Sequence, residues 1–244
     1  MARGDWERTG REGVECPFSA GPTLGLGLCA RTLPDAATLA RRAEEAGFGS
    51  LWVPPDALAP VAEATRAIPV VACVEVALSP DIEVCLPDPA ELEAGLSGRL
   101  SGRLMVSVRF IDPPEAVRLT SRACRRIGAA IMRKVHAVTM KTDTPVLIQG
   151  SCHESLEWIA EQAEAWAYDR ARLACVPTLL GEWRRVAGDK PFIQMLPDGP
   201  GLEDRVAALM RDGVDHVLVT LGSGDGSPAL WGLPATLNLR YSPA

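Results

Sequence analysis

The sequence lacks the features that mark nucleic-acid-binding, secreted and membrane proteins. Its 244 residues carry a net charge of −6 and no block of basic residues, which argues against a nucleic-acid surface. No apolar run approaches the roughly 20 residues that cross a bilayer. The first 22 residues are polar and charged, unlike a signal peptide. We therefore expect no nucleic-acid or membrane partner, and we expect residues 1–22 to form a flexible N-terminal extension.

Patterns for metal binding and for disulfides are also missing. The three histidines, His136, His153 and His216, stand far apart, so their spacing predicts no metal site. The seven cysteines are an odd number, lie mostly inside apolar runs and form no C-x-x-C pair. Such cysteines are typical of reduced thiols packed in the core of a cytoplasmic protein, which is the location that we expect.

What the sequence does contain is an alternation of short apolar runs with helical patterns, repeated about eight times. The apolar runs are the expected strands, at residues 23–29, 50–53, 69–77, 104–109, 145–148, 165–168, 191–196 and 216–221. The expected helices between them include 34–46, 57–67, 89–96, 115–135, 156–163, 173–186 and 202–212. The tail from residue 227 has no clear period.

This alternation predicts an α/β fold, a single (β/α)₈ TIM barrel over residues 23–244. Continuous apolar strands fit parallel pairing, in which both faces of the sheet are covered. A doubly wound open sheet is the main alternative. It is disfavoured because no G-x-G-x-x-G motif opens a helix after the first strand.

The stretch 144–167 contains the best candidate for a binding site. A buried strand runs into a turn of small residues and then into a helical pattern, with the turn formed by Gly150, Ser151 and Cys152. Unpaired N–H groups at a helix start, joined by the hydroxyls of Ser151 and Ser155, suit an anion. The alternative is an ordinary turn with Ser151 as helix N-cap and Glu154 at the capping-box position. The residues alone leave both open.

Four passages of the chain carry a family resemblance. They are LARRAEEAGFGSLWV (39–53), ATRAIPVVACV (64–74), PAELEAGLSGRLSGRLMV (89–106) and the stretch 144–167. In order and spacing they resemble the bacterial luciferase-like family of flavin- and deazaflavin-dependent oxidoreductases. The resemblance implies a monooxygenase or related oxidoreductase that uses reduced FMN and oxygen on a small organic metabolite. It also implies a flavin reductase as the source of reduced FMN, and a homodimer.

Two departures from the family keep other functions open. The segments 109–145 and 196–202 are short where family members have long excursions, so the loops that wall off a substrate pocket are reduced. The run 52–57 also lacks the histidine that the family often carries after the second strand. These departures favour a shortened, non-catalytic flavin-binding protein or a partner subunit of a full-length homologue. A deazaflavin-dependent hydride transferase and a cofactor-free barrel that isomerises a small metabolite are further alternatives.

The resemblance also suggests which residues bind the cofactor. It assigns the phosphate to the turn at Gly150, Ser151 and Cys152, with Ser155 nearby, and to Arg109 at the end of the fourth strand. A guanidinium suits a phosphate because two N–H groups can bind two oxygens. The alternative for Arg109 is an ion pair with Asp112 or Glu115.

Two carboxylates and a thiol complete the candidate site. Glu75 lies inside the third strand, where burial could raise its pKa into the range of a general acid, and Asp56 follows the second strand as a candidate base. Alternatively, Glu75 faces a helix and bonds an arginine, and Asp56 caps the next helix. Cys73 could touch the isoalloxazine ring, or it could fill the core as a small apolar residue.

Overall fold

Eight parallel strands close into a barrel in which each strand pairs with the next and β8 pairs with β1. The computed structural model describes residues 16–18, 21–78, 99–100, 102–111, 120–140, 143–150, 153–169, 173–222 and 226–239. The strands are β1 (Thr23–Gly27), β2 (Ser50–Val53), β3 (Val70–Ala77), β4 (Leu104–Ile111), β5 (Val146–Gln149), β6 (Ala165–Tyr168), β7 (Phe192–Pro197) and β8 (His216–Thr220). The predicted (β/α)₈ barrel is confirmed.

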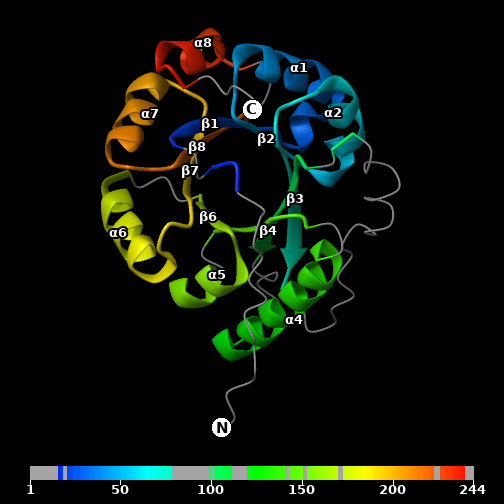
Figure 1. Ribbon diagram of the computed structural model, residues 1–244, viewed down its shortest axis with the longest axis vertical. Coiled ribbons are helices and arrows are strands. Elements are labelled where there is room, and N and C mark those ends of the chain that lie inside the picture. Colours follow the sequence, from blue (N-terminus) through cyan, green and yellow to red (C-terminus); the bar gives the residue numbers. More distant parts are fainter. Residues whose placement is uncertain are drawn as a thin grey trace.

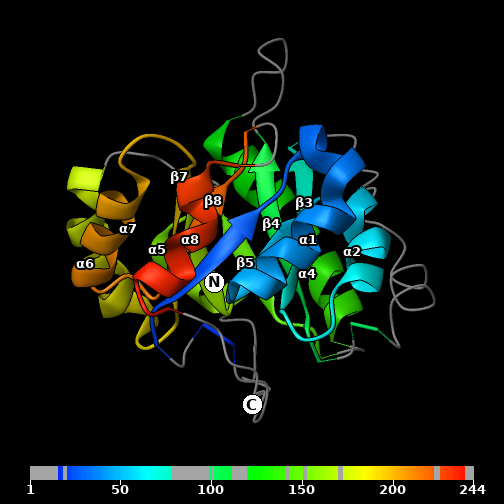
Figure 2. The same cartoon turned by 90° about the horizontal axis from the view of Figure 1, so that it is seen from above.

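Helices surround the strands, as the view down the barrel in Figure 1 and the side view in Figure 2 show. The α-helices are α1 (Ala36–Ala46), α2 (Leu58–Ala64), α4 (Ser121–Thr139), α5 (Leu156–Gln162), α6 (Val176–Ala187), α7 (Leu202–Arg211) and α8 (Pro228–Thr236). Three short 3₁₀ helices join them: η1 (Ala30–Asp35), η2 (Pro55–Ala57) and η3 (Leu173–Cys175).

The strands read as continuous apolar runs because both of their faces are buried. Outward-facing residues pack against the helices in one large cluster, to which Leu24, Leu51 and Val74 belong. Inward-facing residues form a second, smaller cluster inside the barrel, made of Cys16, Phe18, Trp52, Val71, Met105, Leu147, Ala165, Ala167, Ile193 and Leu218. The strand period of two therefore assigns each side chain to the helix layer or to the barrel interior.

A polar network crosses the barrel interior near the N-terminal ends of the strands. His216 is fully buried, with Nδ1 at 2.7 Å from Thr23 Oγ1 and Nε2 at 2.9 Å from Ser50 Oγ. The indole of Trp52 donates to the same serine oxygen at 3.0 Å. The imidazole fits because β1 has a glycine opposite it, and a Cβ at Gly25 would overlap His216 Nε2. Both ring nitrogens of the buried His216 therefore have a hydrogen-bond partner.

Residues near the start of the chain close this end of the barrel. The ring centroids of Phe18 and His216 lie 4.3 Å apart, and both Cys16 and Phe18 are buried. These two residues belong to the segment expected to be a flexible extension. The domain boundary expected at residue 23 therefore leaves out side chains that pack inside the barrel.

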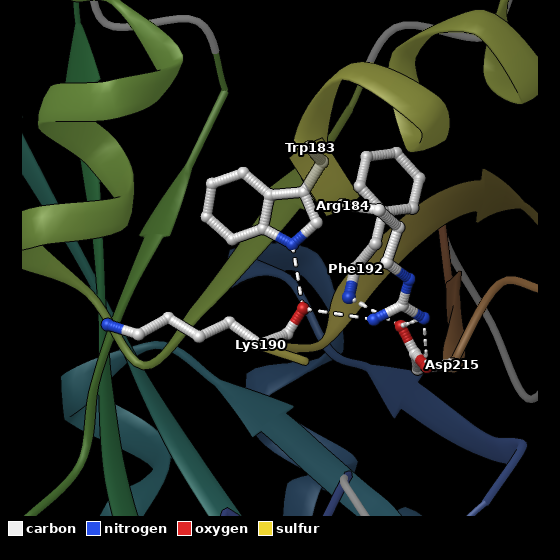
Figure 3. Close-up of polar contacts among 5 residues, drawn as sticks. All are labelled: Trp183, Arg184, Lys190, Phe192 and Asp215. Atoms are coloured by element: carbon white, nitrogen blue, oxygen red, sulfur yellow. Dashed lines mark hydrogen bonds and ion pairs between the residues drawn. The ribbon is translucent and has the colours of Figure 1, made fainter. Parts of the chain in front are cut away.

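The N-terminal ends of β7 and β8 are joined to α6 by the polar contacts drawn in Figure 3. Arg184 Nη2 contacts both carboxylate oxygens of Asp215, at 2.6 and 2.7 Å, and the same carboxylate accepts the Phe192 N–H at 2.7 Å. Trp183 Nε1 and Arg184 Nη1 donate to the Lys190 carbonyl. These bonds attach the helix to two strands at the barrel end opposite the strand C-termini.

Several helix boundaries differ from the predicted ones. Helix α4 begins at Ser121, capped by the Thr120 hydroxyl, and not near residue 115. Helix α5 has Ser155 as its N-cap, so the N-cap alternative for Ser151 is wrong. Helix α8 was not predicted, because its sequence is apolar on nearly every side and so shows no helical period, although Ser227 as N-cap followed by Pro228 is a helix-start signal. The helix expected at 89–96 lies outside the described residues.

Candidate functional site at the barrel mouth

A pocket of about 800 Å³ opens at the C-terminal ends of the strands. All eight strands or the residues directly after them contribute to its wall, so it lies on the barrel axis. Its volume falls in the usual range for small-molecule sites, and this end of a (β/α)₈ barrel is where such enzymes bind their substrates.

The lining changes from apolar to polar toward the opening. Trp52, Met195 and Leu218 line the pocket from inward positions at its deeper part. Five polar side chains line the pocket from inward positions nearer the C-terminal ends of their strands or just beyond them: Glu75, Arg109, Gln149, Asp169 and Thr220. An apolar floor below polar groups suits a flat organic ligand with a polar edge.

Arg109 lies between two carboxylates at the rim. Its Nη1 is 3.3 Å from Glu75 Oε1, and its Nη2 is 3.2 Å from Asp169 Oδ2. Glu75 and Arg109 are register partners on β3 and β4, which brings their side chains together. The alternative partners Asp112 and Glu115 lie outside the described residues. An anion that binds Arg109 has to compete with both of these carboxylates.

The two candidate catalytic carboxylates both line the pocket, but neither is buried. Glu75 has 55% of its side chain exposed, so the burial expected for it is absent, and its role as a general acid stays a prediction. Its arginine partner comes from the neighbouring strand and not from a helix. Asp56 is exposed in the first turn of η2. The N-cap of α2 is Ala57, so Asp56 does not cap that helix.

The turn after β5 is tied down by its own backbone bonds. Gly150 has a φ of 82°, its N–H donates to the Ala167 carbonyl at 2.8 Å, and its carbonyl accepts the Trp166 indole at 2.8 Å. A Cβ on this glycine would lie 3.7 Å from Asp169 Oδ2, so a carboxylate already approaches the turn. The Gly150 amide is therefore not free for a phosphate. Ser151 and Cys152 lie outside the described residues.

Ser155 and Glu154, which follow this turn, have structural contacts. Ser155 Oγ accepts the Trp158 N–H at 3.3 Å, which caps α5, and its hydroxyl donates to the carboxylate of Glu157. The side chain of Glu154 is only 7% exposed and lies 3.9 Å from Arg125 on α4. Desolvation raises the pKa of Glu154 although Arg125 opposes that change. His153 is exposed.

Cys73 lies in the pocket wall as predicted, but its thiol is unreactive. Its Sγ contacts the Val71 carbonyl at 3.8 Å. Desolvation, assisted by the negative charge of Glu75, raises the pKa of Cys73 to about 12. The thiol is therefore protonated near neutral pH and can contact a ligand only as a small apolar group.

Sequence reasoning missed three residues of the site: Gln149, Asp169 and Thr220. A usable signal exists, because the alternation of inward positions can be continued to the end of each strand. Leu147 is followed inward by Gln149, Ala167 by Asp169 and Leu218 by Thr220. Gln149 is only 6% exposed, and no side chain or backbone group within the described part of the chain hydrogen-bonds its amide.

Among the described residues there is neither a metal site nor a helix that could cross a membrane. No group of three or more histidine, cysteine or acidic side chains there could hold a metal ion. None of the described helices combines the length and the apolar character that crossing a bilayer requires. The described cysteines form no disulfide.

Comparison with known proteins finds likeness only at the level of structure. No protein-family model matches the sequence, and no curated protein matches it. An F420-dependent secondary alcohol dehydrogenase, solved with an F420–acetone adduct, is similar at a TM-score of 0.64 and 12% identity, over 91% of this chain and 100% of that one. The coenzyme F420-dependent tetrahydromethanopterin reductase of Methanopyrus kandleri is similar at 0.61 and 12% identity, over 88% and 97%.

Barrels with other chemistry are similar too. A Schiff-base-forming fructose-1,6-bisphosphate aldolase matches at a TM-score of 0.55 and 16% identity, over 91% of this chain and 95% of that one. Identities this low establish a shared fold and no more, since one barrel fold supports many reactions. The chain is therefore a (β/α)₈ barrel whose structural relatives include F420-dependent enzymes.

Proposed function

We propose that this protein is an oxidoreductase that binds a deazaflavin or a flavin in the barrel mouth. The observation that carries the proposal is the pocket of about 800 Å³, with apolar residues in its depth and polar residues at its rim. A flavin-type ring has apolar faces and one polar pyrimidine edge, and it matches that division. The structural likeness to two F420-dependent enzymes supports the same reading of the fold.

Within this class, a deazaflavin such as F420 is the favoured cofactor. Two of the similar structures are F420-dependent enzymes. Reduced FMN with oxygen is supported by the sequence resemblance alone. Once bound, a deazaflavin supplies hydride transfer at its ring. The chain itself would supply a pocket floor through Trp52, Met195 and Leu218, and polar contacts at the rim.

Arg109 remains the candidate for an anionic part of the cofactor. Its ion pairs with Glu75 and Asp169 are partly exposed, so each is worth about 0–1 kcal/mol. A bidentate contact between a guanidinium and a phosphate is a stronger, charge-assisted interaction, of about 1.5–3 kcal/mol per hydrogen bond. Displacing one carboxylate is therefore within reach of a bound phosphate.

Schiff-base chemistry of the kind that the similar aldolase performs is not proposed. It requires a lysine at the reacting carbon. Lys190 donates to the carbonyls of Ala160 and Ala163 at the opposite end of the barrel, and Lys134 lies on α4. No lysine of the described residues lines the pocket.

Binding without turnover is the second candidate. Its specific support is the exposure of the rim, where the side chains of Arg109 and Glu75 are 43% and 55% exposed. A reactive reduced cofactor needs water excluded from its ring. A partner subunit, or a second copy of this chain in a homodimer, would have to supply that cover for turnover.

Titration of the purified protein with F420, FMN and riboflavin tests the proposal. We expect dissociation constants of about 1–100 μM, corresponding to about 5.5–8 kcal/mol, together with a perturbed ring absorbance. If none of the three ligands binds at about 100 μM, the proposed function is rejected. Oxidation of reduced F420 without oxygen indicates hydride transfer, oxygen uptake with reduced FMN indicates a monooxygenase, and binding without either indicates a non-catalytic protein.

Variants at the rim test the role of Arg109. Arg109→Ala should weaken F420 and FMN about tenfold and leave riboflavin, which has no phosphate, unchanged. Asp169→Asn removes one competitor for the guanidinium and should strengthen the same two ligands. Equal FMN affinity for wild type and Arg109→Ala would show that the phosphate lies elsewhere.

A further inference from the structure

Gln149 presents an unused amide to the pocket. It occupies the last inward position of β5, is 6% exposed and lines the cavity. No hydrogen bond joins its side chain to any described residue. The atoms of this amide are not among the fully buried polar atoms without a partner, so they reach the cavity, where a bound ligand can take up their hydrogen bonds.

The surroundings of Gln149 restrict the charge and shape of that ligand. Its register partners are Arg109 on β4 and Ala167 on β6, and the short side chain of Ala167 leaves space beside the amide. Among the described residues, the pocket lining holds the three carboxylates of Asp56, Glu75 and Asp169 and the one guanidinium of Arg109. This balance disfavours an anionic group at Gln149 and suits a neutral one.

We propose that Gln149 is a specificity-determining residue that binds the neutral imide edge of the cofactor ring. A primary amide offers an N–H donor and a C=O acceptor in one plane. The pyrimidine ring of flavins and deazaflavins has an adjacent C=O and N–H, which can accept and donate in return. The inference rests on the proposed function, because it concerns the orientation of that cofactor.

Gln194 is the matched control for Gln149. It is also a buried glutamine on a barrel strand, but it belongs to β7 and does not line the pocket. Its Nε2 donates to the carbonyls of Tyr168 and Met195, at 3.2 and 2.9 Å, while its Oε1 is buried without a partner among the described residues. Gln194 therefore has a structural role of the kind that Gln149 lacks.

The first measurement is thermal unfolding of the ligand-free variants Gln149→Met and Gln194→Met. Methionine keeps the length of the side chain and removes its hydrogen bonding. Gln149→Met should unfold at or above the wild-type temperature, since no protein hydrogen bond is lost. Gln194→Met should unfold several degrees lower, at about 2–4 °C per kcal/mol for a chain of this size. A decrease for Gln149→Met as large as that for Gln194→Met would overturn the proposal.

The second measurement compares ring ligands that lack a phosphate: riboflavin, 5-deazariboflavin and the N3-methyl derivative of each. Methylation at N3 blocks the imide N–H. For wild type and Gln194→Met, methylation should weaken binding about tenfold, and for Gln149→Met it should make no difference. The readout is affinity alone and requires no substrate.

The outcomes separate the two proposals. If wild type binds neither these rings nor F420 and FMN, the proposed function fails and the role of Gln149 fails with it. If wild type binds F420 or FMN but none of the phosphate-free rings, the function stands and the role of Gln149 is rejected. If wild type binds the parent rings and their N3-methyl forms equally, the function stands and the imide contact is rejected. If Gln149→Met and wild type bind the parent rings equally well, the imide contact is likewise rejected.

Discussion

His216 illustrates how the barrel interior changes the properties of a single residue. Desolvation inside the barrel lowers its pKa from 6.5 to about 3. The neutral ring still uses both nitrogens, which lie within hydrogen-bonding distance of Thr23 and Ser50. A histidine that stands alone in the sequence is thus part of the core, and not a metal ligand or an acid–base group at the mouth.

This burial predicts an acid-sensitive stability. Between pH 6.5 and about 3 the unfolded chain binds a proton at this histidine and the folded chain does not. Stability therefore falls as the pH decreases through this window, by up to about 1.4 kcal/mol per pH unit. Urea unfolding at pH 7.5 and pH 5 should show a smaller loss for His216→Gln than for wild type. The exposed His153→Gln variant should keep the wild-type loss, and equal losses in all three proteins would contradict the prediction.

Ser155 allows a helix cap to be distinguished from a cofactor contact. Its Oγ accepts the Trp158 N–H at the start of α5. Ser155→Ala should lower the free energy of unfolding by about 1 kcal/mol. Thr120→Ala, which removes the corresponding cap of α4, should act similarly. If Ser155 also binds the cofactor, only Ser155→Ala will reduce F420 or FMN affinity in titrations of both variants.

At the scale of secondary-structure elements, the contacts of Arg184 with Asp215 determine how α6 is attached. The carboxylate of Asp215 serves both Arg184 and the Phe192 N–H, so its loss leaves two donors without their acceptor (Figure 3). Asp215→Ala should cost about 3 kcal/mol in unfolding free energy, as removal of one partner from a partly buried ion pair does. Chemical denaturation measures this loss.

The neighbouring Arg185 is the control for that experiment. Its ion pair with Glu157 is 3.6 Å long, with both side chains mostly exposed. Arg185→Ala should therefore change stability by less than about 1 kcal/mol. Similar losses in the two variants would show that burial and the shared carboxylate do not matter.

For the whole molecule, closure of the barrel at its N-terminal end depends on a residue outside the expected domain. Phe18 is 1% exposed and packs against the ring of His216. Phe18→Ala should lower the unfolding free energy by about 3–5 kcal/mol. Met140→Ala, at a position that is 59% exposed, should stay within about 0.5 kcal/mol of wild type. Thermal unfolding that is equal for Phe18→Ala and Met140→Ala would contradict this closure.

Local patterns predicted much of this fold. The strands at Ser50–Val53 and Ala165–Tyr168 have the predicted bounds, and α1 ends at Ala46 as predicted, with Gly47 in a left-handed conformation after it. Helix α8 was missed because it is apolar on most of its surface and so has no period to detect. Gln149, Asp169 and Thr220 were missed because they are polar residues at the ends of short apolar runs, where nothing in the local pattern separates a pocket residue from the start of a loop.

The sequence by itself determined the order of strands and helices, and hence the barrel, because these depend on the spacing of apolar residues along short segments. Only the tertiary structure decided which charged side chains form ion pairs at the pocket rim. Arg109 and Glu75 are 34 residues apart, and they meet because β3 and β4 pair in one particular register. The same closure placed His216 beside Gly25 and left the amide of Gln149 facing a cavity. Such contacts depend on strand pairing and burial, which no local pattern encodes.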